Sequence, residues 1–360
     1  MLAQMAPAPG VLTIDLDALV DNWRRVARDV APAQAAAVVK ADAYGLGAGR
    51  VVPALAAAGC RAFFVANLVE ALAIRPLVPD DAVLAVLNGL HPGGEPFAAE
   101  AGITPVLNSV AQARRWQPFA RPAMLQVDTG MARHGLDMAE AAALAGDADF
   151  RAGVPLLALI SHLACADEPD RAENADQLAR FAAASALFPG VARCFANSGG
   201  VQLGAAYHGD MVRAGLCLYG AEPADGRGVP FRPVVGLAAR VLQTRTVAAG
   251  TGVGYGQTWQ APGETRLALL SIGYADGFPR SLSGRGAVWA QGALLPIVGR
   301  VSMDVTVVDA SALSEGALTE GDLVEIIGPH CQIEDVAQEA GTIAYEILTQ
   351  LGHRYERRYL

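Results

Sequence analysis

Short apolar runs alternate with alanine-rich, helix-length stretches along the first 220 residues. The runs are nearly continuous in apolar residues and end at turn-forming or polar residues, which is typical of strands buried on both faces. Stretches such as 51–59, 70–77, 109–119, 138–146 and 172–188 have the length and composition of helices. The pattern predicts eight strands, at 35–39, 62–66, 83–87, 103–107, 123–127, 156–161, 192–196 and 211–218.

Repeated strand–helix units of this kind indicate a parallel sheet covered by helices. Eight units favour a closed (β/α)8 barrel. The alternative is a doubly wound open sheet, in which ligands would also bind at the strand C-termini. The number of strands, and the lack of a GxGxxG phosphate-binding turn, favour the barrel.

The pattern changes after residue 220. A stretch rich in Gly, Pro and charge, 221–233, reads as a linker. Beyond it we expect a second, mostly β domain with short strands and one helix at 333–351. The predicted domains are 1–225 and 226–360. A strand at 11–16, followed by a helix to residue 29 with Asp17 as its N-cap, is a candidate to pack with the second domain. The later strands are predicted at 234–247, 265–272, 287–289, 296–298, 305–308 and 323–327.

A polar residue follows the end of almost every predicted barrel strand. In a (β/α)8 barrel these ends converge on one face, where the active site lies. Any single residue of this kind could be a helix cap, but the recurrence predicts a functional site. The residues are Lys40, Asn67, Asn88, Asn108, Asp128, His162, Asn197 and Ser198.

Lys40 is the only lysine in the chain, so the other 26 of its 27 Lys and Arg residues are arginine. It stands at the end of a buried strand, a poor place for a surface lysine left by chance. A buried lysine lowers its pKa readily and can form a Schiff base, whereas a guanidinium stays charged. We therefore expect Lys40 to act as an amine.

The composition excludes several classes of function. With 52% apolar and 18% charged residues the chain can bury a large core. Its net charge of −9, without a basic block, argues against binding nucleic acid or an anionic membrane. Five scattered cysteines without a CxxC pair fit reduced thiols, and no metal site is expected. No secretory signal or membrane span is evident, so we expect a cytoplasmic protein.

Several motifs occur in one order along most of the chain, and together they resemble the alanine racemases. They are VVKADAYGLG, DTGMARHGL, SHLACADE, ANSGG, VRAGLCLYG, VGYGQTW, IGYADGFPR and GRVSMD. The resemblance implies an N-terminal (β/α)8 barrel and a C-terminal β domain. It also implies a pyridoxal 5′-phosphate (PLP) cofactor, and a homodimer in which the β domain of each subunit completes the active site of the other.

The resemblance also implies catalytic roles. Lys40 would hold PLP as an internal aldimine and then act as acid and base on one face of the substrate. Tyr255 of the partner subunit would act on the other face, since racemisation needs a proton removed from one side and returned on the other. The product would be D-alanine, here expected to supply peptidoglycan.

Further residues are expected around the cofactor and the substrate. Arg213 resembles the arginine that contacts the pyridine nitrogen, and it cannot give up its proton. Arg133 would lie near the phenolic oxygen of PLP and the substrate carboxylate, and His162 and Asn197 would line the ring. Phosphate would be bound by Tyr44, Ser198, the amides of Gly215 and Leu216, and Tyr345. Met303 and Tyr274 would contact substrate, and Asp167, Arg280 and Arg300 would line its entrance.

One position departs from the family pattern. Many members carry a carbamylated lysine two residues before the DTGM motif, where it orients the arginine, and Gln126 stands here. We expect the Gln126 amide to accept a hydrogen bond from Arg133 and to hold this arginine more weakly than a carbamylated lysine would. Three alternatives stay open at this stage: a racemase of serine or a broader range of amino acids, a related decarboxylase, and a non-catalytic PLP-homeostasis protein.

Overall fold

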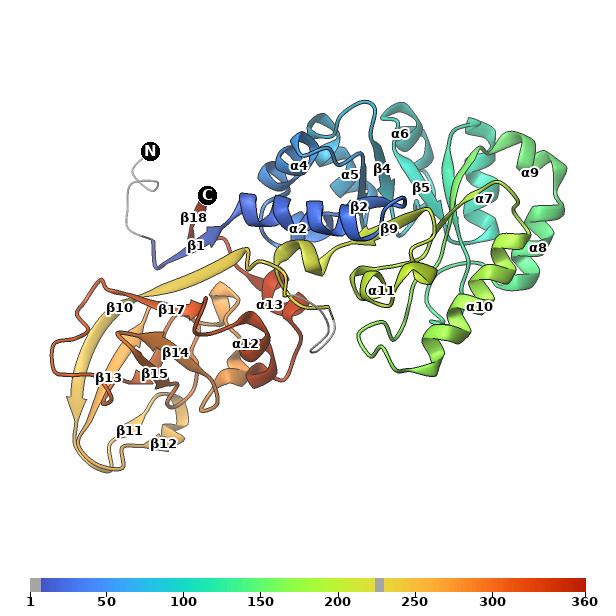
Figure 1. The fold of residues 1–360 in the computed structure, drawn as a ribbon. Helices are drawn as coiled ribbons and strands as arrows, with labels where there is room; N and C mark the ends of the chain where they lie inside the picture. Colours follow the sequence, from blue (N-terminus) through green and yellow to red (C-terminus); the bar gives the residue numbers. More distant parts are fainter. Residues whose placement is uncertain (1–7, 224–229) are drawn as a thin grey trace. The chain divides into compact units, whose positions relative to one another are not determined.

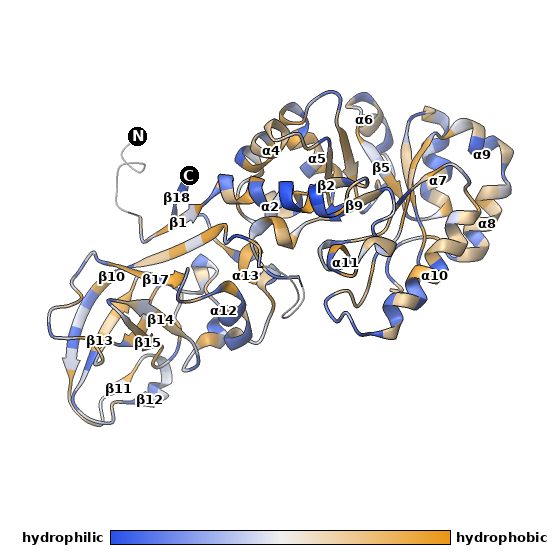
Figure 2. Cartoon of the chain, in the orientation of Figure 1, coloured by the Kyte–Doolittle hydropathy of each residue, from blue (hydrophilic) through white to orange (hydrophobic). Residues whose placement is uncertain are grey.

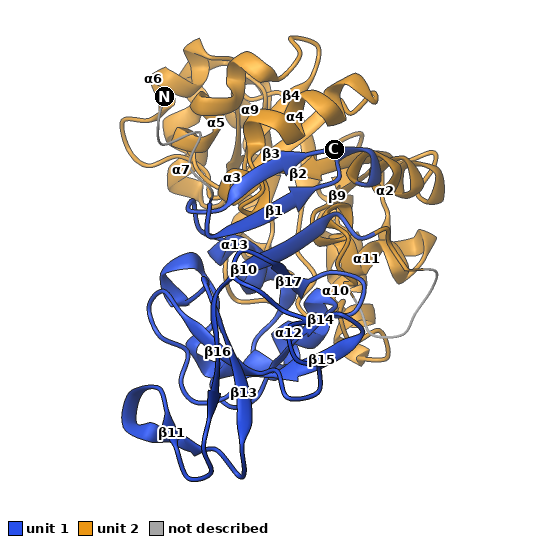
Figure 3. Ribbon diagram, turned by 90° about the vertical axis from the view of Figure 1, so that its left-hand side faces the viewer, with its two compact units in different colours: residues 1–18, 233–360 blue, residues 19–232 orange. Residues whose placement is uncertain are grey.

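The computed structural model describes residues 8–223 and 230–360, which form two compact units. One unit contains residues 19–232, and the other contains residues 1–18 together with 233–360 (Figure 3). The second unit is therefore assembled from both ends of the chain. The domain boundary expected between residues 225 and 226 falls outside the described residues.

The unit 19–232 is a closed barrel of eight parallel strands in sequence order, which confirms the predicted fold class (Figure 1). Three of these strands, β3, β5 and β6, are buried along their whole length, and the other five are buried except at their first one or two residues, as their continuous apolar sequence predicts. The barrel closes where β9 pairs with β2. The strands are β2 (Gln34–Val38), β3 (Ala62–Val65), β4 (Val83–Val86), β5 (Thr104–Leu107), β6 (Ala123–Gln126), β7 (Leu156–Ile160), β8 (Ala192–Cys194) and β9 (Met211–Ala214).

Helices follow the strands around the barrel. The predicted helical stretches are all present, and four short helices that the apolar pattern did not indicate, α3, α6, α9 and α11, join them. The helices are α3 (Lys40–Tyr44), α4 (Ala48–Ala57), α5 (Leu68–Ile74), α6 (Glu95–Glu100), α7 (Val110–Trp116), α8 (Met138–Gly146), α9 (Ala148–Gly153), α10 (Ala172–Ala186) and α11 (Ser198–Gln202).

The first helix, α2 (Leu16–Asp29), begins two residues earlier than an N-cap at Asp17 predicts. Its cap is Asp15 and not Asp17, because the Asp15 carboxylate accepts a hydrogen bond from the Ala18 amide at 2.7 Å. The helix carries both strongly hydrophilic and hydrophobic positions (Figure 2). Among the described residues, no helix has the length and apolar character needed to cross a membrane.

The other unit is organised around β10 (Val235–Val247), a 13-residue strand. It pairs with β1 (Gly10–Ile14) on one side and with β17 (Leu323–Ile327) and β13 (Thr265–Leu270) along its length. The strand near the N-terminus thus belongs to this sheet. The remaining strands are β11 (Gly252–Val253), β12 (Trp259–Gln260), β14 (Ala287–Ala290), β15 (Ala293–Pro296), β16 (Thr306–Asp309) and β18 (Glu356–Tyr359).

The C-terminal segment differs from prediction in two ways. The single helix expected at 333–351 is two helices, α12 (Ile333–Ala340) and α13 (Ala344–Gln350), because Gly341 adopts a positive φ of 71° and caps the first. The chain then forms β18, which the pattern did not predict and which pairs parallel to β1. A run of charged residues, as in Glu356–Tyr359, carries little strand signal because it lacks the apolar–polar alternation of a half-buried strand.

Candidate active site

Lys40 follows β2 and begins a left-handed turn. The next four residues, 41–44, all have positive φ angles, between 53° and 56°, although none is glycine. Each residue in this conformation costs roughly 1–2 kcal/mol relative to the right-handed form. Such strain is characteristic of functional sites and persists only where surrounding contacts impose it.

Glu70 on α5 supplies one of those contacts. Its carboxylate accepts hydrogen bonds from the backbone amides of Ala41 at 2.9 Å and Ala66 at 2.7 Å. The Asp42 carboxylate accepts from the Ala48 amide at 2.7 Å and so fixes the exit of the turn. The backbone directly after Lys40 is thus tied to two neighbouring helices.

The Lys40 side chain is half-buried, and its amine has no hydrogen-bond or ion-pair partner among the described residues. Burial is the main cause that lowers its pKa below 10.5, and the charges of Arg133 and Arg213 lower it further, against the opposing charge of Glu70. A larger share of the amine is therefore unprotonated near neutral pH, as a nucleophile or base requires.

Arg213 on β9 is a buried cation that is bound by backbone carbonyls. Its guanidinium donates to the carbonyl oxygens of Cys194 at 2.7 Å, Ser161 at 2.5 Å and Phe195 at 3.3 Å. These lie at or just beyond the ends of β7 and β8, where the sequence predicted the site. None of these partners neutralises the charge, so the position favours an anionic or electron-rich ligand.

His162 follows β7 and accepts a hydrogen bond from Arg213. The Arg213 Nη2 lies 3.3 Å from the His162 Nδ1. A guanidinium can only donate, so this contact requires Nδ1 to be unprotonated. Burial, followed by the charges of Arg213, Arg133 and Lys40, lowers the His162 pKa well below 6.5. The imidazole is accordingly neutral at physiological pH.

A group of hydrogen-bond donors lies at the ends of β2, β8 and β9. The Gly215 amide donates to the Ser198 hydroxyl at 2.9 Å. A Cβ added to Gly215 would come within 2.4 Å of the Tyr44 hydroxyl, so this phenol lies directly against the Gly215 backbone. Asn197 caps α11 by accepting from the Gly200 amide, and Leu216 begins the next short 3₁₀ turn. Hydroxyl and amide donors beside glycine fit a phosphate group.

Arg133 is less constrained than the other predicted cations. Its side chain is exposed and has no hydrogen-bond or ion-pair partner within the described part of the chain. Gln126 does not accept from it, contrary to the expected contact; the Gln126 amide donates to the backbone oxygen of His134 at 3.2 Å. Gln126 therefore anchors the backbone of the loop that carries Arg133 and does not bind the Arg133 guanidinium.

The remaining substrate residues belong to the other unit. The Tyr274 amide donates to the Ser302 carbonyl at 3.1 Å, and the Ala275 amide donates to the Met303 carbonyl at 3.0 Å. The side chains of Tyr274 and Met303 are exposed. Tyr255 is 72% exposed and lies between Gly254 and Gly256, both with positive φ.

The arginines predicted at the entrance are neighbours in this unit. Arg280 and Arg300 line the same cavity of about 390 Å³, with Ser281, Ser283 and Arg285. Arg300 also lies against the Tyr255 turn, since a Cβ on Gly256 would be 3.3 Å from its Nη1.

Two further predicted residues occupy separate elements. Asp167 is exposed in the loop after β7, and Tyr345 lies on α13. Among the described residues, no cluster of three or more His, Cys, Asp or Glu side chains could hold a metal ion.

Sequence reasoning missed two residues of the barrel site. Glu70 forms a capping box with Asn67, and the Asn-x-x-Glu spacing is a visible signal of this cap. Tyr219 packs against Tyr44, with 4.5 Å between the ring centroids, and donates its hydroxyl to the Val38 carbonyl. No local pattern predicts that contact, because it joins residues 181 positions apart.

The residues present fit PLP. The Lys40 amine, which has no hydrogen-bond partner in the described part of the chain and a lowered pKa, is influenced by the charge of the buried Arg213 guanidinium, and hydroxyl and amide donors gather around Gly215 at the same ends of the strands. Together they offer a covalent attachment point, a partner for a ring nitrogen and a phosphate cradle.

Comparisons with known proteins agree over nearly the whole chain. A family model described as "Alanine racemase, N-terminal domain" matches residues 14–223, and one described as "Alanine racemase, C-terminal domain" matches residues 234–359. A protein of Rhizobium johnstonii named "Alanine racemase, catabolic" is 53% identical over 358 residues, which cover 98% of this chain and 95% of the relative. A protein of the same name from Agrobacterium fabrum is 52% identical over 359 residues, covering 98% and 92%.

A solved structure agrees with these sequence matches. The alanine racemase from Bartonella henselae, with covalently bound pyridoxal phosphate, has 44% sequence identity and a TM-score of 0.95. The match covers 98% of this chain and 100% of that chain.

Proposed function

The chain belongs to the alanine racemase family of PLP enzymes, and from this premise we propose that it interconverts L-alanine and D-alanine by a two-base mechanism. The observation that carries the proposal is the environment of Lys40. Its amine is unpartnered among the described residues and its pKa is lowered by burial and by Arg133 and Arg213.

PLP, when bound, supplies a ring that withdraws electrons from an attached amino acid and so makes the proton on Cα acidic. Lys40 is the residue that would carry PLP covalently. When it is not attached to the cofactor, the Lys40 amine would be able to take or return the Cα proton on one face. Its lowered pKa favours this exchange near neutral pH.

Arg213 limits the acidity of the site. Its guanidinium keeps its protons, so it can donate to a ring nitrogen without protonating it. The neutral His162, which accepts from Arg213, adds no further positive charge. Such a site favours return of the proton to Cα over its delivery elsewhere, which supports racemisation over transamination.

The second base in this proposal is Tyr255 of a partner subunit. A phenol with its ordinary pKa near 10 is a weak base at neutral pH and needs nearby positive charge. Arg300, which lies against the Tyr255 turn, is a source of such charge. The exposure of Tyr255, Tyr274 and Met303 suits residues that complete the site of a second copy. We therefore propose a cytoplasmic homodimer with shared active sites.

The first test is proton NMR of the protein with PLP and L-alanine in heavy water, with a chiral assay on the same sample. The proposal expects loss of the α-proton signal and appearance of D-alanine. Lys40→Ala should lose both covalent PLP and racemisation. Tyr255→Phe should retain PLP and lose most racemisation, above all from L-alanine.

Other outcomes would point elsewhere. Exchange with serine or other amino acids, but not alanine, would indicate a different racemase. Covalent PLP without exchange of any amino acid would favour a cofactor carrier. A Tyr255→Phe variant as active as the wild type would exclude the two-base assignment.

The physiological role has two candidates. The first is supply of D-alanine for peptidoglycan, as the sequence predicts; the second is consumption of alanine, which the name "Alanine racemase, catabolic" of two relatives favours. Deletion of the gene distinguishes them. A requirement for added D-alanine would support the first role, and failure to grow on alanine as carbon source would support the second.

A further inference from the structure

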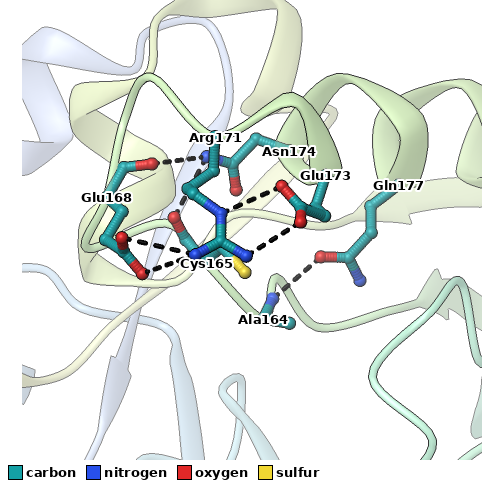
Figure 4. A network of polar contacts seen from close by, with 7 residues as sticks. All are labelled: Ala164, Cys165, Glu168, Arg171, Glu173, Asn174 and Gln177. Carbon is teal, nitrogen blue, oxygen red and sulfur yellow. Dashed lines mark hydrogen bonds and ion pairs between the residues drawn. The ribbon is translucent and has the colours of Figure 1, made fainter.

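Gln177 on α10 connects two active-site loops. The loop after β6 carries Thr129 and Arg133, and the loop after β7 carries His162. The Gln177 Nε2 donates to the His162 carbonyl at 3.0 Å and to the Thr129 hydroxyl at 3.2 Å. Its Oε1 accepts from the Ala164 amide at 2.8 Å, as Figure 4 shows. The side chain is 2% exposed.

The orientation of this amide is determined by its partners. A backbone N–H can only donate and a backbone carbonyl can only accept, so the contacts with Ala164 and His162 permit one orientation. Both amide protons and the amide oxygen are used, and all three bonds go to the two loops.

The connection continues to the cations of the site. The Thr129 hydroxyl lies 2.7 Å from the Ser161 hydroxyl, and the Ser161 carbonyl accepts from Arg213. Arg180, one helical turn after Gln177 on α10, donates to the Thr129 carbonyl at 3.1 Å. A displacement of Gln177 would therefore reach both His162 and the Ser161 carbonyl that binds Arg213.

Asn174, one turn earlier on α10, provides a contrast. Its amide donates to the carbonyls of Cys165 and Glu168, both at 3.0 Å (Figure 4). It anchors the far part of the same loop, and its side-chain hydrogen bonds among the described residues go to neither His162 nor Thr129. Arg171 ties that part further through exposed ion pairs with Glu168 and Glu173, which add little stability because solvent screens them.

We propose that Gln177 is a positioning residue that fixes the loops after β6 and β7 relative to each other and so holds His162 and Arg213 in place for the cofactor. The inference rests on the proposed function, because it assigns Gln177 to the site of that reaction. Errors of about 1 Å in such a site can lower the rate about 100-fold, so a buried amide with three directed bonds suits this task.

The experiment compares two near-isosteric variants of Gln177 with two controls on α10. Gln177→Met removes all three bonds while retaining volume, and Gln177→Glu keeps the acceptor for Ala164 but sets an anion against the His162 carbonyl. Asn174→Leu removes the two hydrogen bonds to the Cys165 and Glu168 carbonyls, and so loosens the later part of the loop after β7. Asp176→Asn changes an exposed neighbour. Hydrogen–deuterium exchange of the cofactor-free proteins, PLP affinity, and kcat and KM are measured for each.

We expect both Gln177 variants to exchange faster at residues 127–133 and 161–164 and to bind PLP about tenfold more weakly or worse, with kcat lowered more than KM is raised. Asn174→Leu should speed exchange at 165–170 alone, and Asp176→Asn should match the wild type.

Unchanged exchange at 127–133 and 161–164 in Gln177→Met would overturn the proposal, as would PLP affinity equal to that of Asn174→Leu. A uniform loss of protection across the barrel would also overturn it, because it would mean a general packing role. Failure of the proposed function is seen separately, since the wild type itself would then neither bind PLP covalently nor racemise alanine.

Discussion

At the scale of single residues, the barrel site gathers three positive charges, and Glu70 is the one carboxylate among the described residues whose charge raises the pKa of Lys40. Arg213 is bound by carbonyl oxygens, Arg133 has no partner among the described residues, and Lys40 has only the nearby charge of Glu70. A buried charge without a counter-ion is unfavourable unless a ligand supplies one. The arrangement suits a cofactor that brings its own negative charge.

The lowered pKa of His162 gives a prediction on stability. The pKa of His162 in the folded protein lies below its unfolded value of 6.5. As the pH falls below 6.5, the unfolded chain therefore binds more protons than the folded protein does. The cofactor-free protein should therefore lose stability on acidification, by at most about 1.4 kcal/mol per pH unit from this residue. His162→Gln should remove that part of the slope.

Thermal unfolding of the cofactor-free wild type and His162→Gln from pH 7.5 to pH 5 checks this expectation. The wild type should lose more in midpoint temperature than the variant over this window. His91→Gln serves as control, since this histidine is exposed. Parallel curves for the wild type and His162→Gln would show that the imidazole titrates normally.

Residue chemistry was predictable where the sequence was unusual. A single lysine at the end of a strand indicated Lys40 directly. The contact of Gln126 was not predictable, because an amide can donate or accept, and its actual partner, the His134 carbonyl, depends on the path of the loop between them.

At the scale of elements, the left-handed turn after Lys40 is the feature that local sequence opposes. Alanine favours the right-handed helix, yet Ala41 and its neighbours adopt positive φ. The contact of Glu70 with the Ala41 amide comes from another helix. The barrel strands, by contrast, were predictable to within a few residues, because burial on both faces leaves a continuous apolar run.

This turn predicts opposite effects of glycine at two alanines. Ala41 is exposed and has a φ of 53°, so Ala41→Gly should raise the free energy of unfolding by roughly 0.5–1 kcal/mol. Ala41→Val should lower it by at least about 1 kcal/mol and reduce covalent PLP, because a β-branched residue resists positive φ.

The matched control is Ala179→Gly, at an exposed position of the right-handed helix α10, where glycine should destabilise by about 1 kcal/mol. Urea denaturation of the cofactor-free variants measures all three changes. A loss of stability in Ala41→Gly as large as that in Ala179→Gly would contradict the account of backbone strain.

At the scale of the whole molecule, the candidate residues divide between two compact units. Lys40, His162 and Arg213 belong to the barrel, whereas Tyr255, Tyr274 and Met303 belong to the unit built around β10. Local patterning predicted both kinds of architecture. The placement of the first strand with the second domain was also predicted and is confirmed, whereas β18 and its parallel pairing with β1 were not, because pairing of distant strands leaves no periodic signal.

The proposed sharing of sites between subunits predicts complementation. Lys40→Ala and Tyr255→Phe homodimers should each be nearly inactive. In a mixed dimer, one site would contain both substitutions and the other would contain the native Lys40 of one subunit and the native Tyr255 of the other. Random pairing of equal amounts should then restore about a quarter of wild-type activity, because half of the dimers carry one intact site of two.

Coexpression of the two variants with different affinity tags permits isolation of the mixed dimer, whose PLP content should be half that of the wild type. The purified mixed dimer should reach about half of wild-type activity. The control pairs Lys40→Ala with the wild type, which should also leave one intact site. Mixed dimers no more active than the two parents would mean that Tyr255 serves the site of its own chain, since each chain would then contain one defect.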